Sequence, residues 1–217
     1  MNDKTILRTI IPISIIGDSQ TGKTCIVSTF NDIKFNEKNI SSIGVDFLVK
    51  EIEMKNGIKL KLKIWDTAGQ EMYHSMALNC LKSVLGIIYI FDVTNRKTLD
   101  SINKWVKDVD DTIEADKFPS VLVGNKIDLE DEREVTFEEG KNLAEQYGFN
   151  YIETSAKSGK NINELFIGLA ENIYKKFKDE FPQPNQNIVI KAENLKKKKK
   201  KNCCFAKNKN DQNDENK

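Results

Sequence analysis

Residues 10–24, IIPISIIGDSQTGKT, decide the fold of this chain. The first seven are an apolar run that ends at Gly17, which is typical of a strand buried on both faces of a sheet. The next eight match the pattern GxxxxGK[ST], in which backbone N–H groups and the start of a helix surround phosphate oxygens. An ordinary glycine turn is the alternative, but the strand before the loop and the helix predicted after it favour a phosphate site.

The loop is therefore expected to bind the phosphates of a nucleotide. Lys23 would reach the β- and γ-phosphates, and the hydroxyl group of Thr24 would coordinate Mg²⁺. The motif by itself does not identify the base. The predicted contacts with the nucleotide in this segment are Gly17, Asp18, Ser19, Gln20, Thr21, Gly22, Lys23, Thr24 and Cys25.

The charge of the chain is unevenly distributed. Of the 217 residues, 39% are hydrophobic and 31% are charged, and the formal net charge is +1. Residues 191–217 hold ten lysines and four acidic residues, so the tail is basic and the remainder is mildly acidic. A basic tail points to an anionic lipid surface as partner or, alternatively, to nucleic acid.

The cysteines and the apolar runs exclude several classes of protein. The four cysteines are too few for a disulfide framework and lack the CxxC spacing of a zinc site. No signal peptide is visible, and no apolar run reaches the ~20 residues of a transmembrane helix. We therefore expect a cytoplasmic protein with reduced thiols.

Buried strands alternate with helices from residue 10 to residue 178. This order predicts an α/β fold with a six-stranded, mostly parallel sheet and helices on both faces. The dipeptide Asn56-Gly57 predicts a hairpin that supplies one antiparallel edge strand. Thr136 with Glu139, and Asn161 with Glu164, mark the starts of the last two helices. The expected strands are 10–16, 45–54, 58–65, 84–91, 119–125 and 149–156, and the expected helices are 23–31, 97–115, 137–147 and 162–178.

Two loops at strand ends indicate which base is bound. Asp128, in Asn125-Lys126-Ile127-Asp128, could accept hydrogen bonds from the ring N–H and the amino group of guanine, a pair of donors that adenine lacks. Residues 154–157, TSAK, follow the last strand and could offer backbone N–H groups to the guanine carbonyl. The predicted base-site residues are Asn125, Lys126, Asp128, Ser155, Ala156 and Lys157.

A third loop, WDTAGQE at 65–71, carries residues suited to the γ-phosphate. Asp66 could hold Mg²⁺ through a water molecule, and Gly69 could bring its N–H close to the phosphate. Gln70 could orient an attacking water. A plain strand and tight turn would explain the glycine but not the flanking Asp and Gln.

With these motifs in place, the chain resembles the small GTPases of the Ras superfamily, and more narrowly the Rab proteins. The resemblance rests also on IGVDF at 43–47, KLKIWD at 61–66 and GIIYIFD at 86–92, and it covers residues 10–178. It implies a P-loop NTPase fold, with a GTPase domain over residues 9–180 and a hypervariable, disordered tail over 181–217. It also implies that Phe35 packs against guanine, and that Ser42 replaces the threonine that contacts Mg²⁺ and the γ-phosphate in the GTP state.

The same resemblance implies a switch that hydrolyses GTP to GDP slowly and needs an activating protein. Lys23 and Gln70 would be the catalytic residues, and Thr24, Ser42 and Asp66 would place Mg²⁺. A monomer is expected. It would meet an exchange factor, an activating protein and effectors through residues 39–47 and 69–84, and would regulate vesicle-mediated transport on the cytosolic face of intracellular membranes.

Two other classes of function stay open. The chain could be a GTP-binding interaction module with little hydrolysis, for which Gln20 and Ser42 are the motivation. The lysine run could instead be a nuclear or nucleic-acid-binding element. The intact Asp66 and Gln70 argue against the first, and the IGVDF stretch and paired cysteines argue against the second.

Three departures from the Rab pattern stand out. Gln20 replaces a glycine, which costs about 1 kcal/mol or more if this position has a positive φ. Ser42 keeps the hydroxyl group of threonine but loses the methyl group. Residues 72–84 are unusually rich in Met and Leu, which indicates either a changed partner surface or a differently packed helix.

The tail combines six lysines at 196–201 with Cys203 and Cys204, two possible sites of lipid attachment. Rab proteins carry geranylgeranylated cysteines at or near the C-terminus, whereas thirteen residues follow Cys204 here and no CaaX box ends the chain. The cysteines could be palmitoylated beside the basic patch, the overhang could be trimmed or tolerated before prenylation, or the lysines could act alone. We expect lipid on at least one cysteine.

Overall fold

The computed structural model describes residues 8–33, 45–67 and 80–182. The chain divides into two units, Met1–Gln186 and Asn187–Lys217, and every described residue belongs to the first. The predicted division between a domain at 9–180 and a tail at 181–217 stays a prediction. Among the described residues, no helix is long and apolar enough to cross a membrane.

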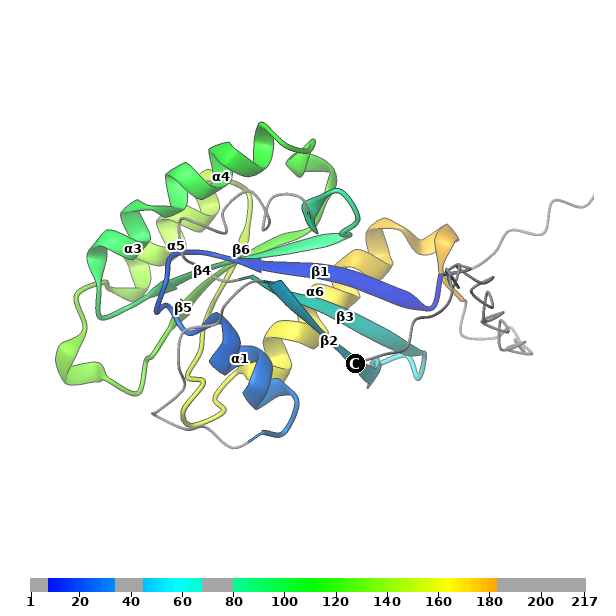
Figure 1. The fold of residues 1–217 in the computed structure, drawn as a ribbon, viewed down its shortest axis with the longest axis horizontal. Helices are drawn as coiled ribbons and strands as arrows, with labels where there is room; N and C mark the ends of the chain where they lie inside the picture. The colour runs from blue at the N-terminus through cyan, green and yellow to red at the C-terminus, as the bar shows by residue number, and fades with distance from the viewer. Residues whose placement is uncertain (1–7, 34–44, 68–79, 183–217) are drawn as a thin grey trace, which may run out of the picture. The chain divides into compact units, whose positions relative to one another are not determined.

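A six-stranded sheet forms the centre of the described part of the chain (Figure 1). Its order is β2-β3-β1-β4-β5-β6, and β2 pairs antiparallel with β3 while the other neighbours are parallel. This arrangement confirms the predicted mostly parallel sheet with one antiparallel edge strand. The strands are β1 (Ile10–Ile16), β2 (Val45–Glu53), β3 (Lys59–Thr67), β4 (Gly86–Asp92), β5 (Ser120–Asn125) and β6 (Asn150–Glu153).

The hairpin between β2 and β3 turns where the Asn-Gly dipeptide predicts it. The N–H of Met54 donates to the carbonyl of Ile58 at 2.9 Å, and the N–H of Gly57 donates to the carbonyl of Met54 at 2.8 Å. The side-chain oxygen of Asn56 accepts from the N–H of Ile58 at 3.1 Å. These bonds close the connection and fix the register that pairs Glu53 with Lys59.

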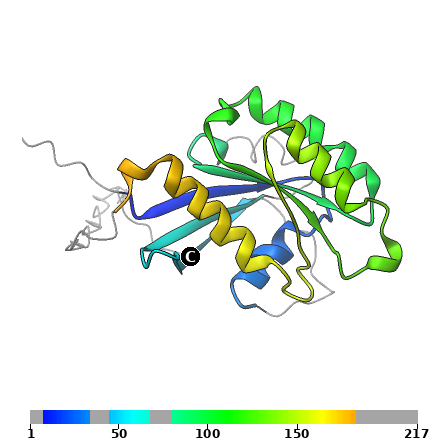
Figure 2. The same cartoon turned by 180° about the vertical axis from the view of Figure 1, so that it is seen from behind.

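Helices cover both faces of the sheet (Figures 1 and 2). Helices α1 and α6 lie on one face, and α3, α4 and α5 lie on the other. The two-sided cover explains why β4 and β5 are buried along their whole length and β1 is buried from Ile13 to Ile16. The helices are α1 (Lys23–Phe30), α3 (Arg96–Asp100), α4 (Ile102–Asp110), α5 (Phe137–Gln146) and α6 (Ile162–Lys176), with short 3-10 turns η2 (Ala115–Lys117), η3 (Glu130–Glu132) and η4 (Lys178–Glu180).

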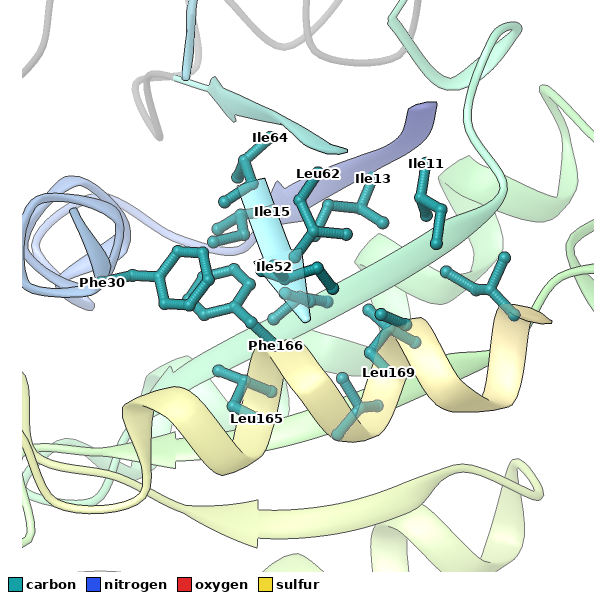
Figure 3. Packing of buried hydrophobic residues seen from close by; sticks show 14 of the residues in the cluster. Ile11, Ile13, Ile15, Phe30, Ile52, Leu62, Ile64, Leu165, Phe166 and Leu169 are labelled. Carbon is teal, nitrogen blue, oxygen red and sulfur yellow. The ribbon is translucent and has the colours of Figure 1, made fainter. Parts of the chain in front are cut away.

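Two hydrophobic cores follow from this layering. On one face, Ile11, Ile13 and Ile15 of β1 pack towards α1 and α6, where the rings of Phe30 and Phe166 stack with centroids 4.1 Å apart (Figure 3). On the other face, residues of β4 pack against Trp105, Val106 and Val109 of α4 and against Ala144 of α5. Side chains alternate along β4, so Ile88 and Ile90 belong to the first core and Ile87, Tyr89 and Phe91 belong to the second.

The single helix predicted at 97–115 is wrong. It is divided into α3 and α4 at Ser101, which keeps a helical backbone with φ −65° and whose N–H still donates to the carbonyl of Lys97 at 3.0 Å, and α4 ends at Asp110. Asp108, Asp110 and Asp111 stand at the C-terminal end, where negative charge opposes the helix dipole. The strand predicted at 149–156 is also too long, because β6 ends at Glu153 and the chain then turns along the sheet edge.

The starts of the last two helices agree with the prediction, but only one has the expected cap. Thr136 and Glu139 form a full capping box at the start of α5. Asn161 occupies the N-cap position of α6 in the left-handed conformation, with φ 61°, and makes no capping bond. Its side-chain amide instead donates to the carbonyl of Glu153 at 2.7 Å, so it ties α6 to the end of β6.

Two helical glycines provide a matched test of this packing. A Cβ on Gly140 of α5 would lie 2.4 Å from the hydroxyl oxygen of Tyr151, whereas a Cβ on Gly168 of α6 would meet nothing within 4 Å. We expect Gly168→Ala to raise the free energy of unfolding by ~0.5–1 kcal/mol through helix propensity. Gly140→Ala should lower it by ~1–3 kcal/mol, because the half-buried tyrosine must move. Urea unfolding measures both changes, and equal effects would show that Tyr151 yields without cost.

Candidate functional site

The loops predicted to bind a nucleotide lie at one edge of the sheet. They follow β1, β5 and β6, which run parallel, so their carboxyl ends face the same side (Figure 1). In open α/β sheets this edge is where ligands bind. Contacts among the loops show how closely the chain brings them together.

The backbone of the phosphate loop needs its glycines. Gly17 has φ 149°, and a Cβ on it would lie 2.2 Å from the carbonyl oxygen of Ile90 in β4. Gly22, the N-cap residue of α1, has φ 96°, and a Cβ there would lie 2.4 Å from the side-chain nitrogen of Asn125. The loop therefore approaches two neighbouring strands too closely for any side chain at these positions.

Gln20 lies between these glycines in a conformation that disfavours a side chain. Its φ is 66°, in the left-handed region, and its side chain is exposed. Position 20 therefore has the positive φ at which replacing glycine is expected to cost free energy. The residue carries a strain of about 1–2 kcal/mol. The surrounding loop holds the strain, since Gly17 and Gly22 fix the backbone on both sides.

The side chain of Lys23 folds back over the phosphate loop. Its Nζ atom donates to the carbonyl oxygens of Gly17 at 2.9 Å and Asp18 at 2.6 Å. Burial lowers the pKa of Lys23 to about 8, and the charges of Asp66 and Asp18 offset part of that effect. A buried ammonium held by carbonyl dipoles is suited to receive an anion.

The amide of Asn125, almost fully buried at the end of β5, joins the phosphate loop to the last loop. Its nitrogen donates to the carbonyl of Thr21 at 2.9 Å. Its oxygen accepts from the hydroxyl group of Thr154 at 3.1 Å and from the N–H of Ala156 at 3.3 Å. One side chain therefore sets the spacing of segments from three separate strand ends.

Asp128 is held by the neighbouring base loop. The hydroxyl group of Ser155 donates to its Oδ1 atom at 2.6 Å and accepts from the N–H of Ser158 at 3.0 Å. This hydrogen bond to one carboxylate oxygen fixes the rotation of the carboxylate group. Asp128 itself is exposed at the surface. Lys126, with φ 69°, turns its ammonium group to Asp92 at the end of β4, 2.5 Å away.

The donors near Lys23 fit a magnesium ion. Thr24 offers a hydroxyl group and Asp66 a buried carboxylate, and oxygen ligands of this kind suit Mg²⁺. Within 8–33, 45–67 and 80–182, no group of three or more His, Cys, Asp or Glu could hold a metal by itself.

Several predicted site residues lie outside the described part of the chain. The structure therefore does not place the predicted guanine contact, the third Mg²⁺ ligand, the γ-phosphate residues or the lipidation sites, and these roles stay predictions. The residues concerned are Phe35, Ser42, Gly69, Gln70, Cys203 and Cys204.

Sequence reasoning missed residues that support the site from a distance. The indole N–H of Trp105 in α4 donates to Oδ1 of Asp18 at 2.8 Å, and the hydroxyl group of Thr29 donates to the carbonyl of Ala156 at 2.8 Å. Both contacts join segments far apart in the chain, so no local pattern marks them. Asp92, the partner of Lys126, is different, because it ends the motif at 86–92 and could have been found from the sequence.

Comparison with known proteins gives the chain its family. A model described as the Ras family matches residues 13–175. The chain belongs to the Ras family. It is a Rab-like small GTPase, since it is 40% identical over 190 residues to the Ras-related protein Rab-10 of Caenorhabditis elegans, covering 88% of this chain and 94% of that protein. Members of this family hydrolyse GTP, slowly on their own.

Other Rab proteins match at similar levels. The Ras-related protein Rab-8B of Dictyostelium discoideum is 37% identical over 195 residues, covering 90% of this chain and 93% of that protein. The human Rab-8B is 41% identical over 162 residues, covering 75% of this chain and 77% of that protein. The Rab resemblance seen in the motifs is thus confirmed.

The strain at Gln20 can be measured in this Rab-like GTPase. We expect Gln20→Gly to exceed Gln20→Ala in free energy of unfolding by ~0.5–1 kcal/mol. Relief of the left-handed penalty outweighs the larger backbone entropy of glycine in the unfolded chain. Both variants remove the side chain, so alanine is the matched control. Equal stabilities in urea unfolding would show that the loop is not strained.

Lys23 should make stability depend on pH. The pKa of Lys23 in the folded protein is about 8, below the usual 10.5. Burial of the charged ammonium group therefore lowers the free energy of unfolding of the nucleotide-free protein, and this penalty is present in full below pH 8. This penalty is relieved as pH rises through the window from 8 to 10.5, because the unfolded chain then binds more protons. We expect Lys23→Met to be more stable than the parent at pH 7, with a gap that narrows by about 2–3 kcal/mol by pH 10.

Unfolding of nucleotide-free protein at pH 7, 8.5 and 10 tests this expectation. Lys104→Met, at an exposed position of α4, reports the general effect of losing one positive charge. A pH-independent gap between parent and Lys23→Met would mean that Lys23 is not buried in its charged form.

Proposed function

We propose that this chain is a GTP-dependent switch with the nucleotide bound along the edge formed by β1, β5 and β6. The observation that carries the proposal is the hydrogen bonding of Asn125, which sets the phosphate loop and the base loop at a fixed separation. The ribose of a nucleotide joins its aromatic base to its charged phosphates and so limits the distance between them. A site of this kind gains affinity from being formed in advance.

Guanine recognition would rest on Asp128. Its carboxylate, oriented by Ser155, would accept from the ring N–H and the amino group of guanine, and the loop at residues 154–157 would offer backbone N–H groups to the carbonyl. An adenine would leave the carboxylate without these donors, which is a strong basis for discrimination. Lys126, whose ammonium group pairs with Asp92, would present its aliphatic stem to the ring.

Phosphate binding would rest on the loop and on Lys23. The backbone N–H groups of residues 19–24 and the N-terminus of α1 supply partial positive charge. The ammonium group of Lys23, now bonded to two carbonyls, would gain a phosphate partner and recover its ordinary pKa. Thr24 and Asp66, with Ser42, would hold Mg²⁺, which when bound neutralises charge on the phosphates.

Hydrolysis would be slow without a partner protein because no arginine of the chain would supply positive charge at the γ-phosphate. All three arginines of the chain are described and are paired elsewhere: Arg8 with Glu180, Arg96 with Glu139, and Arg133 with Glu130 and Glu153. Gln70 would orient the attacking water, while an activating protein would supply the missing positive charge.

Regulators and effectors would bind residues 39–47 and 69–84, and the described part of this surface is suited to contact. Phe47 is 52% exposed although its ring lies beside Trp65, with centroids 5.4 Å apart. The ammonium group of Lys63 lies over both rings, at 4.5 and 4.0 Å from their centroids. An exposed aromatic group with a nearby cation is typical of interface anchors.

The relatives suggest the setting of this switch. Rab proteins act on membranes, so we propose that the chain regulates vesicle-mediated transport on the cytosolic face of an intracellular membrane. The six lysines at 196–201 would attract anionic lipid, and Cys203 and Cys204 would carry the lipid that makes attachment stable.

Single-turnover hydrolysis of preloaded GTP tests the enzyme. We expect slow phosphate release by the parent protein and release at least about tenfold slower by Gln70→Leu, because the water loses its orienting group. The strain at Gln20 motivates a second candidate, a GTP-binding module with little hydrolysis. If Gln20→Gly hydrolyses GTP and the parent does not, the second candidate is right. Phosphate release that never depends on Gln70, with or without activating proteins, would contradict the switch mechanism.

Membrane recovery from native cells tests the tail. Changing Cys203 and Cys204 together to serine should abolish recovery at physiological salt, because the lysines alone add at most ~1 kcal/mol each and are screened. Replacing the six lysines by glutamine is the matched control and should weaken recovery in a salt-dependent way. Unchanged recovery of the serine variant would rule out lipid attachment at these cysteines.

A further inference from the structure

Arg133 connects the two segments that carry the loops of the proposed base site. It lies five residues after Asp128, beyond the short turn η3. Its guanidinium group donates to both carboxylate oxygens of Glu153, at 2.8 and 3.1 Å, and to the carbonyl of Val135 at 3.0 Å. The same side chain donates from Nε to Glu130 at 3.0 and 3.1 Å. One arginine thus holds two acidic residues from different segments.

The segment between Asp128 and Arg133 is short and internally bonded. The N–H of Leu129 donates to the carbonyl of Lys126 at 3.0 Å, and the N–H of Glu132 donates to the carbonyl of Leu129 at 3.0 Å. The N–H of Arg133 continues the series to the carbonyl of Glu130 at 3.2 Å. Consecutive turns of this kind transmit the position of Arg133 to Asp128.

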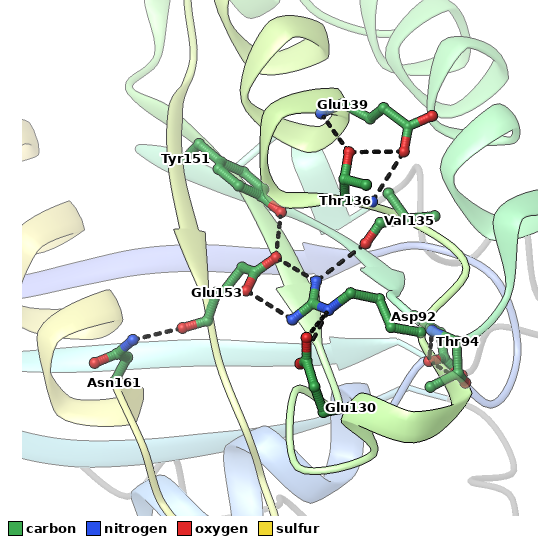
Figure 4. A network of polar contacts seen from close by, with 10 residues as sticks. Asp92, Thr94, Glu130, Val135, Thr136, Glu139, Tyr151, Glu153 and Asn161 are labelled. Atoms are coloured by element: carbon green, nitrogen blue, oxygen red, sulfur yellow. Dashed lines mark hydrogen bonds and ion pairs between the residues drawn. The ribbon is translucent and has the colours of Figure 1, made fainter.

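Glu153, the partner of Arg133, is fixed on its other sides. Tyr151 donates its hydroxyl group to Oε1 of Glu153 at 3.1 Å, and Asn161 donates to the Glu153 carbonyl at 2.7 Å (Figure 4). Burial and the Glu153 charge raise the pKa of Tyr151 well above its usual value, so the phenol remains a donor. Glu153 is therefore a rigid support for Arg133.

These contacts close a ring around the base site. Asp128 and Arg133 lie on one segment, and Ser155 and Glu153 lie on the other. The hydrogen bond from Ser155 to Asp128 closes one end, and the Arg133–Glu153 ion pair closes the other. The segment of Asp128 is also joined to the end of β6 before Asp128, by Asn125 and by the N–H of Ile127, which donates to the carbonyl of Thr154 at 3.3 Å. The ion pair is the contact with β6 on the other side of Asp128, so removing it leaves the segment held there only before and at Asp128.

We propose that Arg133 is a positioning residue for guanine recognition, which acts by holding the Asp128 segment against the end of β6 through Glu153. The inference rests on the proposed function, since it concerns the same base site. Arg133 does not itself recognise the base. It sets the orientation of the carboxylate that does, and so determines how strongly the site prefers guanine to a base without the amino group.

Another arginine of the chain shows what an ordinary exposed ion pair looks like. Arg8 and Glu180 are 2.6 Å apart with side chains 48% and 43% exposed, and Arg8 lies just before β1, at the opposite end of that strand from the phosphate loop. The side chains of Arg133 and Glu153 are only 17% and 13% exposed and form two parallel bonds. A shielded bidentate pair holds its geometry far better than an exposed one. Arg8→Met is therefore the matched control for Arg133→Met.

The test compares binding of GDP with binding of IDP, whose hypoxanthine base lacks the amino group of guanine. A general loss of stability weakens both nucleotides alike, so only a displaced Asp128 carboxylate changes their ratio. We expect Arg133→Met to reduce the preference for GDP over IDP about tenfold, the scale of one weakened hydrogen bond to a charged group. Arg8→Met should keep the preference of the parent protein.

Two further variants keep the test decisive. Glu153→Gln retains the size of the side chain and removes its charge, so it should lower the same preference even if Arg133→Met does not fold. Asp128→Ala should abolish the preference altogether. If Asp128→Ala abolishes it while Arg133→Met and Glu153→Gln leave it unchanged, the positioning role is wrong and the base site stands. If Asp128→Ala has no effect on it, the proposed base site itself is wrong.

Discussion

The side-chain amide of Asn125 stands at the end of β5 with 1% of the residue exposed, and the candidate site depends on its hydrogen bonds. It bonds Thr21 in the phosphate loop and both Thr154 and Ala156 in the last loop. Away from water these bonds are strong, and losing one would leave a buried polar group unsatisfied. The requirement for Gly22 follows from the same contact, because any side chain there would strike the Asn125 nitrogen.

Few positively charged side chains are available to the candidate site around Asn125. Lys23 is the buried cation of the phosphate loop, and its ammonium group is held by two backbone carbonyls. The three arginines are all committed to glutamates, and Arg133 supports the base loops. In the proposed function, the field at the phosphates would come from Lys23 and from backbone dipoles. Such a site would be formed in advance but would lack part of the positive charge that the reaction needs.

Much of the fold could be read from the residues because periodicity and turn chemistry are local. Buried strands gave continuous apolar runs, the Asn56-Gly57 dipeptide marked the hairpin, and Thr136 with Glu139 marked the start of α5. The expected helix at 97–115 was wrong because it is divided at Ser101 and ends at Asp110, where acidic residues oppose the helix dipole. A hydrophobic period does not register either effect.

The sequence by itself determined the order of the strands and helices, the phosphate loop, the base motifs and the family, because each is written in contiguous residues. Only the tertiary structure decided that Asn125 joins the loops, that Gln20 has a positive φ and that Trp105 contacts Asp18. It also decided that Arg133 closes a ring through Glu153. These features arise where segments tens of residues apart meet at one edge of a sheet, and no local pattern of residues specifies which side chains will touch there.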